Sequence, residues 1–134
     1  MARITPENLE TMLRAYVGAA LWSSTDDDGE PMDAGRDISD IAPDTLAGMR
    51  DDCETFANAN ASDIQAARDS GVYVAGERYG YSQVGHDFWL TRNGHGAGFW
   101  DRGLGDIGER LSAAARACGE VNLFVNDDGK VYQE

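Results

Sequence analysis

The chain has 134 residues, which suits one domain with a single hydrophobic core and is too short for two. A hydrophobic content of 42% argues against a wholly disordered chain, and no apolar run approaches the roughly 20 residues that cross a bilayer. The formal net charge of −13 disfavours direct binding to nucleic acid or to an anionic membrane. We therefore expect one domain over residues 1–134 with no membrane segment.

The first residues, MARITPENLE, contain no apolar signal-peptide core, so we expect a cytoplasmic protein. Cys53 and Cys118 lie far apart in the sequence and lack the doublet spacing of a metal site. In a reducing compartment both are expected to be small buried thiols.

The first helix is expected over residues 6–22. Thr5 can cap this helix, and Pro6 suits its first position. Its apolar residues recur at three- and four-residue spacing, as Leu9, Met12, Leu13, Tyr16, Val17, Ala20 and Leu21. Residues 23–40 are polar and acidic with glycine and proline breakers, which predicts a long loop.

A second helix is expected to begin near Pro43. Its apolar stripe consists of Leu46, Met49, Cys53 and Phe56. Residues 58–70 either extend this helix or form a separate short one, and Gly71 is a plausible stop.

The segment after Gly71 contains the most distinctive run of the chain. Residues 72–74 suggest a short strand, and residues 76–85 suggest a loop. Two runs that resemble strands, residues 86–92 and 97–102, then flank Asn93-Gly94-His95-Gly96. Asn-Gly between such runs is typical of a hairpin.

The C-terminal part predicts another helix and another hairpin. Apolar residues from Leu104 onward recur at helical spacing until Gly119. Apolar residues occupy alternate positions in residues 121–125, which predicts a strand. Residues 126–129 are expected to form a turn, and residues 131–132 the second strand of the hairpin. Residues 6–70 would be a mainly helical acidic part and residues 86–134 a part in ββαββ order. The predicted fold class is α+β, with N-terminal helices packed on a small antiparallel sheet of two hairpins.

The predicted hairpin supplies the candidate binding residues. Alternation along its strands would place Phe88, Leu90 and Phe99 on a core face, unless the turn has three residues. The other face would carry two tryptophans beside an arginine, a stacking platform for a base, nucleotide or peptide. We favour the alternative, in which the tryptophans pack under a helix and Asp87 pairs with Arg102. The residues to test for ligand or partner binding are His86, Asp87, Trp89, Arg92, His95, Trp100, Asp101 and Arg102.

No metal, cofactor or catalytic site is predicted. His86 and His95 would lie roughly 20 Å apart on a hairpin at ~3.3 Å per residue, too far for one ion. Residues 24–35 superficially resemble a calcium loop but lack its first and last acidic ligands. Asp106 is expected to cap a helix, which we prefer to an anion site at that helix start. No nucleophile elbow or phosphate-binding loop is present, so an enzyme is not the favoured interpretation.

The acidic residues are concentrated in the first half of the chain. Residues 1–70 carry fifteen acidic residues and five arginines. Spaced acids in this half would imitate the charge of nucleic acid and occupy a basic cleft. They are Asp26, Asp27, Asp28, Glu30, Asp33, Asp37 and Asp40. The alternative is an acidic surface that only keeps the protein in solution.

Two segments resemble a known group of proteins. The run HDFWLTRNGHGAGFWDRG (residues 86–103) and the piece ALWSSTD (residues 20–26) are similar to segments of small acidic proteins encoded by tailed bacteriophages, plasmids and related mobile elements. The similarity covers most of the chain, with residues 70–85 matching least. The resemblance implies a non-structural accessory protein of the bacterial cytoplasm and carries no biochemical role.

The leading functional hypothesis is therefore a non-enzymatic interaction protein of phage or mobile-element origin. Its partner would be a host or mobile-element protein with a basic surface, such as a defence protein that it inhibits. The alternative is a small-molecule or nucleotide binder, or an enzyme, that uses residues 86–102.

Overall fold

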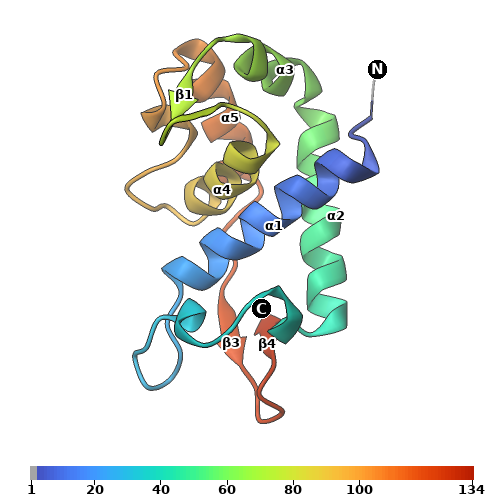
Figure 1. The fold of residues 1–134 in the computed structure, drawn as a ribbon, viewed down its shortest axis with the longest axis vertical. Helices are drawn as coiled ribbons and strands as arrows, with labels where there is room; N and C mark the ends of the chain where they lie inside the picture. Colours follow the sequence, from blue (N-terminus) through green and yellow to red (C-terminus); the bar gives the residue numbers. More distant parts are fainter. Residues whose placement is uncertain (1–2) are drawn as a thin grey trace.

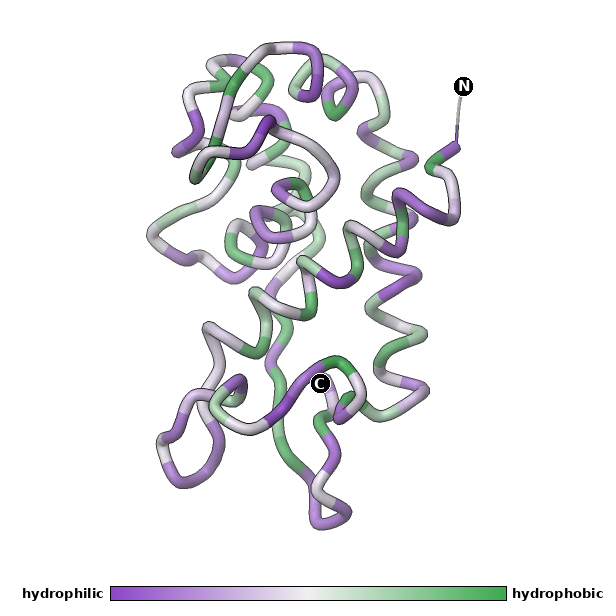
Figure 2. The backbone as a smooth tube through the Cα atoms, in the orientation of Figure 1, coloured by the Kyte–Doolittle hydropathy of each residue, from purple (hydrophilic) through white to green (hydrophobic). Residues whose placement is uncertain are grey.

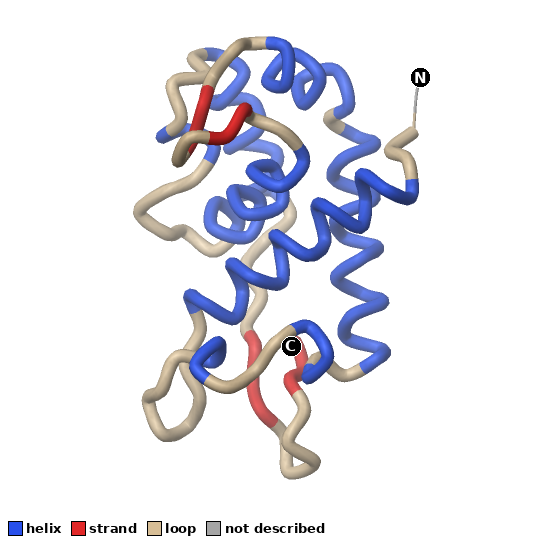
Figure 3. Tube along the Cα trace, viewed as in Figure 1, coloured by secondary structure: helices blue, strands red, loops and turns tan. Residues whose placement is uncertain are grey.

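The structure is a computed structural model that describes residues 3–134. In that range it is α+β, with five α-helices and two small antiparallel two-stranded sheets (Figures 1 and 3). The α-helices are α1 (Pro6–Ser23), α2 (Pro43–Ala59), α3 (Ala61–Asp69), α4 (Tyr81–Arg92) and α5 (Asp106–Ala117). The strands are β1 (Tyr73–Val74), β2 (Glu77–Arg78), β3 (Leu123–Val125) and β4 (Val131–Gln133). Short 3-10 helices are η1 (Met32–Ala34), η2 (Ile38–Asp40) and η3 (Phe99–Asp101).

The predicted hairpin over residues 86–102 is wrong. Residues 86–92 belong to α4, and residues 99–101 form η3, so the expected ββαββ order is not found. Residues 87–92 are all buried. A helix that is buried on every side shows no polar face, and its pattern cannot be told from that of a buried strand.

The Asn-Gly pair ends α4 instead of turning a hairpin. Asn93 has φ −101°, and only Gly94 takes a positive φ, of 69°. The amide of His95 donates to the carbonyl of Leu90 at 3.0 Å, and that of Gly94 donates to Thr91 at 3.2 Å. These two bonds form a Schellman motif, in which glycine is the favoured residue because it adopts the left-handed conformation without strain.

Several predicted helix boundaries are confirmed. The Thr5 hydroxyl accepts a hydrogen bond from the amide of Asn8 at 3.2 Å, which caps α1, and Pro6 is the first residue of that helix. Pro43 likewise begins α2, and α3 is the separate short helix that was one of the two alternatives. The cap of α5 is Gly105, with Asp106 as the first helical residue, so the predicted cap is displaced by one position.

The two hairpins in the structure are β1–β2 and β3–β4. The C-terminal hairpin was predicted, and Phe124 pairs with Tyr132 at its centre. The first was not, because residues 76–85 were expected to be a loop. They contain β2 and the start of α4. In the β1–β2 pair, Val74 lies opposite Glu77.

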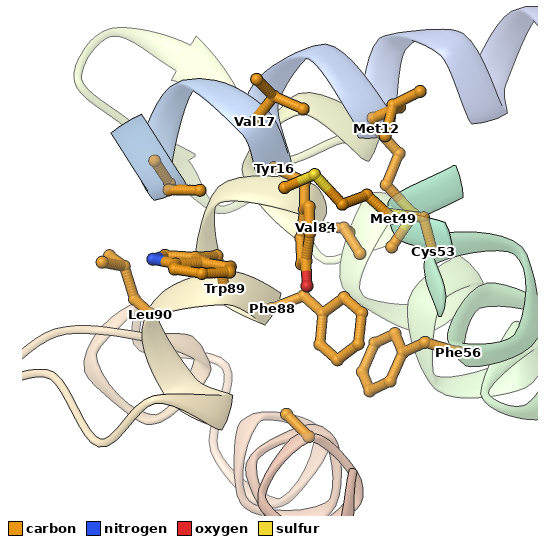
Figure 4. Packing of buried hydrophobic residues seen from close by; sticks show 14 of the residues in the cluster. Met12, Tyr16, Val17, Met49, Cys53, Phe56, Val84, Phe88, Trp89 and Leu90 are labelled. Atoms are coloured by element: carbon orange, nitrogen blue, oxygen red, sulfur yellow. The ribbon is translucent and has the colours of Figure 1, made fainter. Parts of the chain in front are cut away.

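The core forms where α1 crosses α4 and α2. The ring of Tyr16 contacts Phe88 at a centroid distance of 5.3 Å and meets Trp89 edge-on at 5.4 Å (Figure 4). Phe88 in turn stacks on Phe56 of α2 at 4.1 Å. The expected core residues Phe88, Leu90 and Phe99 are all buried, although a helix and not a strand places the first two.

Residues 24–41 form an ordered connection with the two short helices η1 and η2, where a long loop was expected. Thr25 pairs with Pro31 in an isolated bridge. The end of the segment joins the C-terminal hairpin, because the amide of Ala42 donates to the carbonyl of Val131 at 2.9 Å. The segment and the β3–β4 hairpin therefore lie at the same end of the molecule (Figure 1). There the loop after α1 and the tip of the hairpin are hydrophilic, and the strand β3 is hydrophobic (Figure 2). None of the helices within residues 3–134 is both long and apolar enough to cross a membrane.

Candidate functional site

A pocket of about 370 Å³ lies between α1, the β1–β2 hairpin and α4. Small residues of α1 form one wall, and the turn between β1 and β2 forms part of the rim. Polar side chains come from the hairpin, from α4 and from the segment after η3. The lining includes Gly18 of α1, Glu77 of the hairpin, Ser82, His86 and Asp87 of α4, and Arg102.

A buried ion pair lies beside the pocket. The Nε and Nη2 atoms of Arg102 donate to the carboxylate of Asp87, with the shortest distance at 2.7 Å. The side chain of Asp87 is 1% exposed and that of Arg102 is 17% exposed. The hydroxyl of Tyr79 also donates to Asp87 at 2.8 Å. The pairing of Asp87 with Arg102 was expected, but on two strands that do not exist.

The Asp87 carboxylate fixes the orientation of the guanidinium. Its two oxygens accept bonds from Arg102 and Tyr79, so its charge is compensated inside the protein. The hydrogen bonds to Asp87 raise the pKa of Arg102, and burial raises the pKa of Tyr79. Both donors therefore stay protonated at neutral pH. The Nη1 atom of Arg102 has no hydrogen-bond partner among residues 3–134.

His86 lines the same pocket and is half-buried. Burial lowers the pKa of its imidazole, and the negative charge of Asp87 offsets part of that effect. The imidazole is therefore mainly neutral at pH 7, with one nitrogen that donates and one that accepts. Within the described residues neither nitrogen is hydrogen-bonded. The ring of Trp22, which is 61% exposed, lies 6.4 Å from the His86 ring.

Two further polar groups lie on the pocket lining. One oxygen of Glu77 accepts a hydrogen bond from the side-chain amide of Gln83 at 3.1 Å. The other oxygen has no partner in the described part of the chain. The hydroxyl of Ser82 is likewise not hydrogen-bonded to residues 3–134, and Ser82 is exposed. The pocket thus offers an acceptor on one element and donors on others.

The other predicted binding residues are dispersed. Trp89 is buried in the core, 2% exposed, and its indole N–H donates to the hydroxyl of Ser23 at 2.7 Å. Trp100 is 46% exposed on η3. The shared tryptophan face depended on the hairpin and is not formed. Asp101 and His95 are exposed, and His95 lines a different hollow beside Trp89.

Arg92 is a buried structural residue on another side of α4. It donates to the carbonyls of Cys118 and Gly119 at 3.0 and 2.8 Å, and these bonds hold the C-terminal end of α5 against α4. It also donates to the hydroxyl of Tyr16 at 3.0 Å and to Asp52 at 2.9 Å. These bonds engage all three nitrogens of its guanidinium group with other parts of the protein.

The two cysteines differ in exposure. Cys53 is buried, as expected, and burial raises the pKa of its thiol. Cys118 is exposed, which contradicts the expectation that both are buried. Among residues 3–134, no three His, Cys, Asp or Glu side chains are grouped so as to hold a metal ion.

The predicted acidic surface divides into two kinds of residue. Asp26 and Asp40 are half-buried. Asp26 accepts bonds from the amides of Asp28 and Glu30 and from Arg36, and the bond from Glu30 contributes most to lowering its pKa. The carboxylate of Asp40 accepts from the amide of Asp37 at 2.9 Å. The exposed acids of this end of the molecule include Asp27, Asp28, Glu30, Asp33, Asp37, Asp44, Asp127 and Asp128.

The pocket was not visible in the sequence because its residues come from distant segments. Tyr79 and Glu77 lay in a region expected to be a loop. The one local signal was Gly18, a glycine in the interior of α1, where glycine costs roughly 1 kcal/mol relative to alanine. The arrangement can bind and orient a small polar molecule. No protein-family model, no curated protein and no solved structure matches the chain.

Proposed function

We propose that this protein is a binding protein that takes a small molecule into the pocket beside His86, Asp87 and Arg102. The supporting observation is the orientation of Arg102. Burying a carboxylate is costly unless it is paired and hydrogen-bonded. Here the buried carboxylate of Asp87, which also accepts a hydrogen bond from the buried Tyr79 hydroxyl, holds two nitrogens of the Arg102 guanidinium. The third nitrogen has no partner among residues 3–134, and Arg102 lines the pocket.

The size and shape of the pocket also support this proposal. A volume of about 370 Å³ falls within the range of small-molecule sites, near its lower end. Five of the eleven lining residues are alanine, glycine or valine, and the other six are polar or charged residues from the hairpin, from α4 and from the segment after η3. Such a lining combines apolar contact with a small number of directional hydrogen bonds, which is typical of ligand sites.

A substitution that fills the pocket tests the proposal. A Cβ atom built on Gly18 meets no heavy atom within 4 Å, so Gly18→Leu introduces a side chain at the pocket wall without a backbone clash. Gly48 of α2 is exposed and equally uncrowded, so Gly48→Leu is the matched control. A fragment library is screened by NMR against both variants. We expect compounds that shift His86 and Arg102 resonances to bind the control and not Gly18→Leu; equal binding to both would contradict the proposal.

We propose, as a second function, that the exposed acidic end engages a basic host or defence protein for a phage or mobile element. Exposed acids from residues 27–44 and from residues 127–128 lie at one end of the molecule (Figures 1 and 2). The Tyr132 hydroxyl donates to Asp128, and this bond raises the pKa of Tyr132; the negative charge of Asp44 adds a smaller contribution in the same direction. The basic residue of residues 27–44 is Arg36, which is paired with Asp26, and Lys130, just after the second segment, is exposed.

This second function has its own experiment. The variant carries Asp27→Asn, Asp28→Asn, Glu30→Gln and Asp33→Asn, which removes charge from exposed positions only. Both proteins are used as bait in bacterial lysate at rising salt. We expect the wild type to retain a nucleic-acid-binding protein that added DNA displaces, and the variant to lose it. Retention of the same protein by both baits would rule out the acidic end as the contact.

A further inference from the structure

We infer that the ligand of the pocket is a small zwitterion, with its carboxylate on Arg102 and its ammonium group on Glu77. This inference rests on the proposed small-molecule function and names the ligand class. The apolar part of the ligand would lie over the small residues Ala15, Gly18 and Ala19 of α1.

The carboxylate of the ligand is inferred from the hydrogen-bond donors of the pocket that have no partner among residues 3–134. A guanidinium has five N–H donors and no acceptor, so whatever meets the Nη1 atom of Arg102 must accept hydrogen bonds. The neutral imidazole of His86 and the hydroxyl of Ser82 can each supply one more donor on the same lining. A carboxylate has two oxygens with about four acceptor positions, which is enough for all three.

The ammonium end follows from Glu77. This residue belongs to the hairpin and lines the pocket; one of its oxygens accepts a bond from Gln83 of α4, and the other has no partner in residues 3–134. A carboxylate there repels a ligand that carries only negative charge. It favours one that carries a cationic donor.

Net charge supports a ligand that is neutral overall. Asp87 already compensates the positive charge of Arg102, and Glu77 leaves the lining with an excess of negative charge at neutral pH. The whole chain has a net charge of −13. A simple anion is therefore disfavoured by the long-range field, whereas a zwitterion is not, and its two ends still meet opposite charges.

The rim of the pocket is built with local strain. Ala75, in the two-residue turn between β1 and β2, has φ +53° and is the one non-glycine residue of the described chain with a positive φ. This turn sets the position of Glu77 against the pocket, and Ala75 itself lines it. Strained backbone is often found where a site requires a particular geometry.

The test uses analogues that differ by one charged group. Leucine and 6-aminohexanoate are the zwitterions, with two different separations of charge. Hexanoate lacks the ammonium group, hexylamine lacks the carboxylate, and hexanamide lacks both charges. Binding is measured by NMR titration of the full chain, following the His86 ring and the Arg102 Nε–H. We expect at least one zwitterion to bind about tenfold more tightly than each singly charged analogue, a difference of about 1.4 kcal/mol.

Two variants assign the ends of the ligand. Glu77→Gln removes the charge of an exposed side chain, so it should fold normally. It should weaken the preferred zwitterion about tenfold, because the ammonium group loses its partner, and it should not weaken hexanoate, because the repulsion between Glu77 and an anion is removed. Gly18→Leu should abolish binding of the zwitterion, and Gly48→Leu should not.

The outcomes separate this inference from the proposed function. If hexanoate, hexylamine or hexanamide binds as tightly as both zwitterions, or if Glu77→Gln has no effect, the zwitterion inference is overturned. In that case a fragment that Gly18→Leu excludes still supports a small-molecule pocket. If none of the five compounds and no library fragment distinguishes Gly18→Leu from Gly48→Leu, the inference and the proposed function both fail.

Discussion

The backbone of Gly85 in α4 lies directly against the backbone of Met12 in α1. A Cβ atom built on Gly85 overlaps the carbonyl oxygen of Met12 and comes within 3.1 Å of the amide nitrogen of Tyr16. This contact sets how closely the two helices approach, and it fixes the adjoining His86 and Asp87 relative to the wall formed by α1.

We expect Gly85→Ala to lower the free energy of unfolding by about 3 kcal/mol or more, because neither helix backbone can move aside cheaply. Gly18→Ala is the control, since Gly18 is also helical and uncrowded. It should raise the stability by roughly 0.5–1 kcal/mol through helix propensity alone. Urea unfolding followed by circular dichroism measures both. A Gly85→Ala protein as stable as the wild type would show that the helices are not in this contact.

The second prediction concerns the Asp87–Arg102 pair. Arg102→Gln leaves a carboxylate that is 1% exposed without its partner, which should cost about 3–5 kcal/mol. The double variant Asp87→Asn/Arg102→Gln removes both charges and should recover part of this loss. Urea unfolding of the wild type, both single variants and the double variant gives the coupling energy.

The matched control for this pair is Arg110–Asp63. It has the same hydrogen-bond pattern, with a shortest distance of 2.8 Å, but the Arg110 side chain is 57% exposed. We expect Arg110→Gln to cost much less than Arg102→Gln, because water solvates the partner that remains. Equal costs at the two sites would contradict the buried environment of Asp87.

The elements that the sequence predicted carry their own local signals. Thr5 and Pro6 mark the start of α1, and the spacing of its apolar residues marks the buried face. The β3–β4 hairpin was recognisable from alternation and from a turn that contains Gly129. In both cases one face is buried and the other is exposed to solvent. The spacing of the apolar residues therefore indicates whether the segment is a helix or a strand.

The α4 helix carries no such signal. Its residues from Asp87 to Arg92 are buried on all sides, and the Asn93-Gly94 pair suits a helix end as well as a hairpin turn. The candidate site depended on this element. Asp87 and Arg102 could be paired by chemistry, but only tertiary structure brings Tyr79, Glu77 and the wall of α1 beside them.

The third prediction concerns the pH dependence of stability through His86. Burial lowers the pKa of this imidazole below its ordinary 6.5, so the folded chain binds the proton less readily than the unfolded chain. Below pH 6.5 the unfolded state therefore binds more protons, and the free energy of unfolding falls until the pH reaches the folded pKa. Above pH 6.5 both states are neutral at this residue and the contribution vanishes.

We expect His86→Gln to remove this decline between pH 7.5 and pH 5.5, measured by urea unfolding at several pH values. His95→Gln, at an exposed histidine, should retain it. The acids whose pKa is lowered, among them Asp26 and Asp37, have an ordinary value of 3.8, so the stability they contribute is lost only in more acidic solution. An unchanged slope in His86→Gln would assign the dependence to another group.

The last prediction concerns the turn at the pocket rim. Ala75 has φ +53° and Gly76 has φ +82°, as a type I′ turn requires at both central positions. An alanine in the left-handed region costs roughly 1–2 kcal/mol, whereas asparagine is tolerated there, and Asn-Gly is a preferred pair for this turn. We therefore expect Ala75→Asn to raise the free energy of unfolding by about 1 kcal/mol. Ala47→Asn, at an exposed position inside α2, should instead lower it by roughly 0.5 kcal/mol. If Ala75→Asn destabilises the chain as Ala47→Asn does, the turn does not hold residue 75 at positive φ, and Glu77 loses the geometry that directs it toward the pocket.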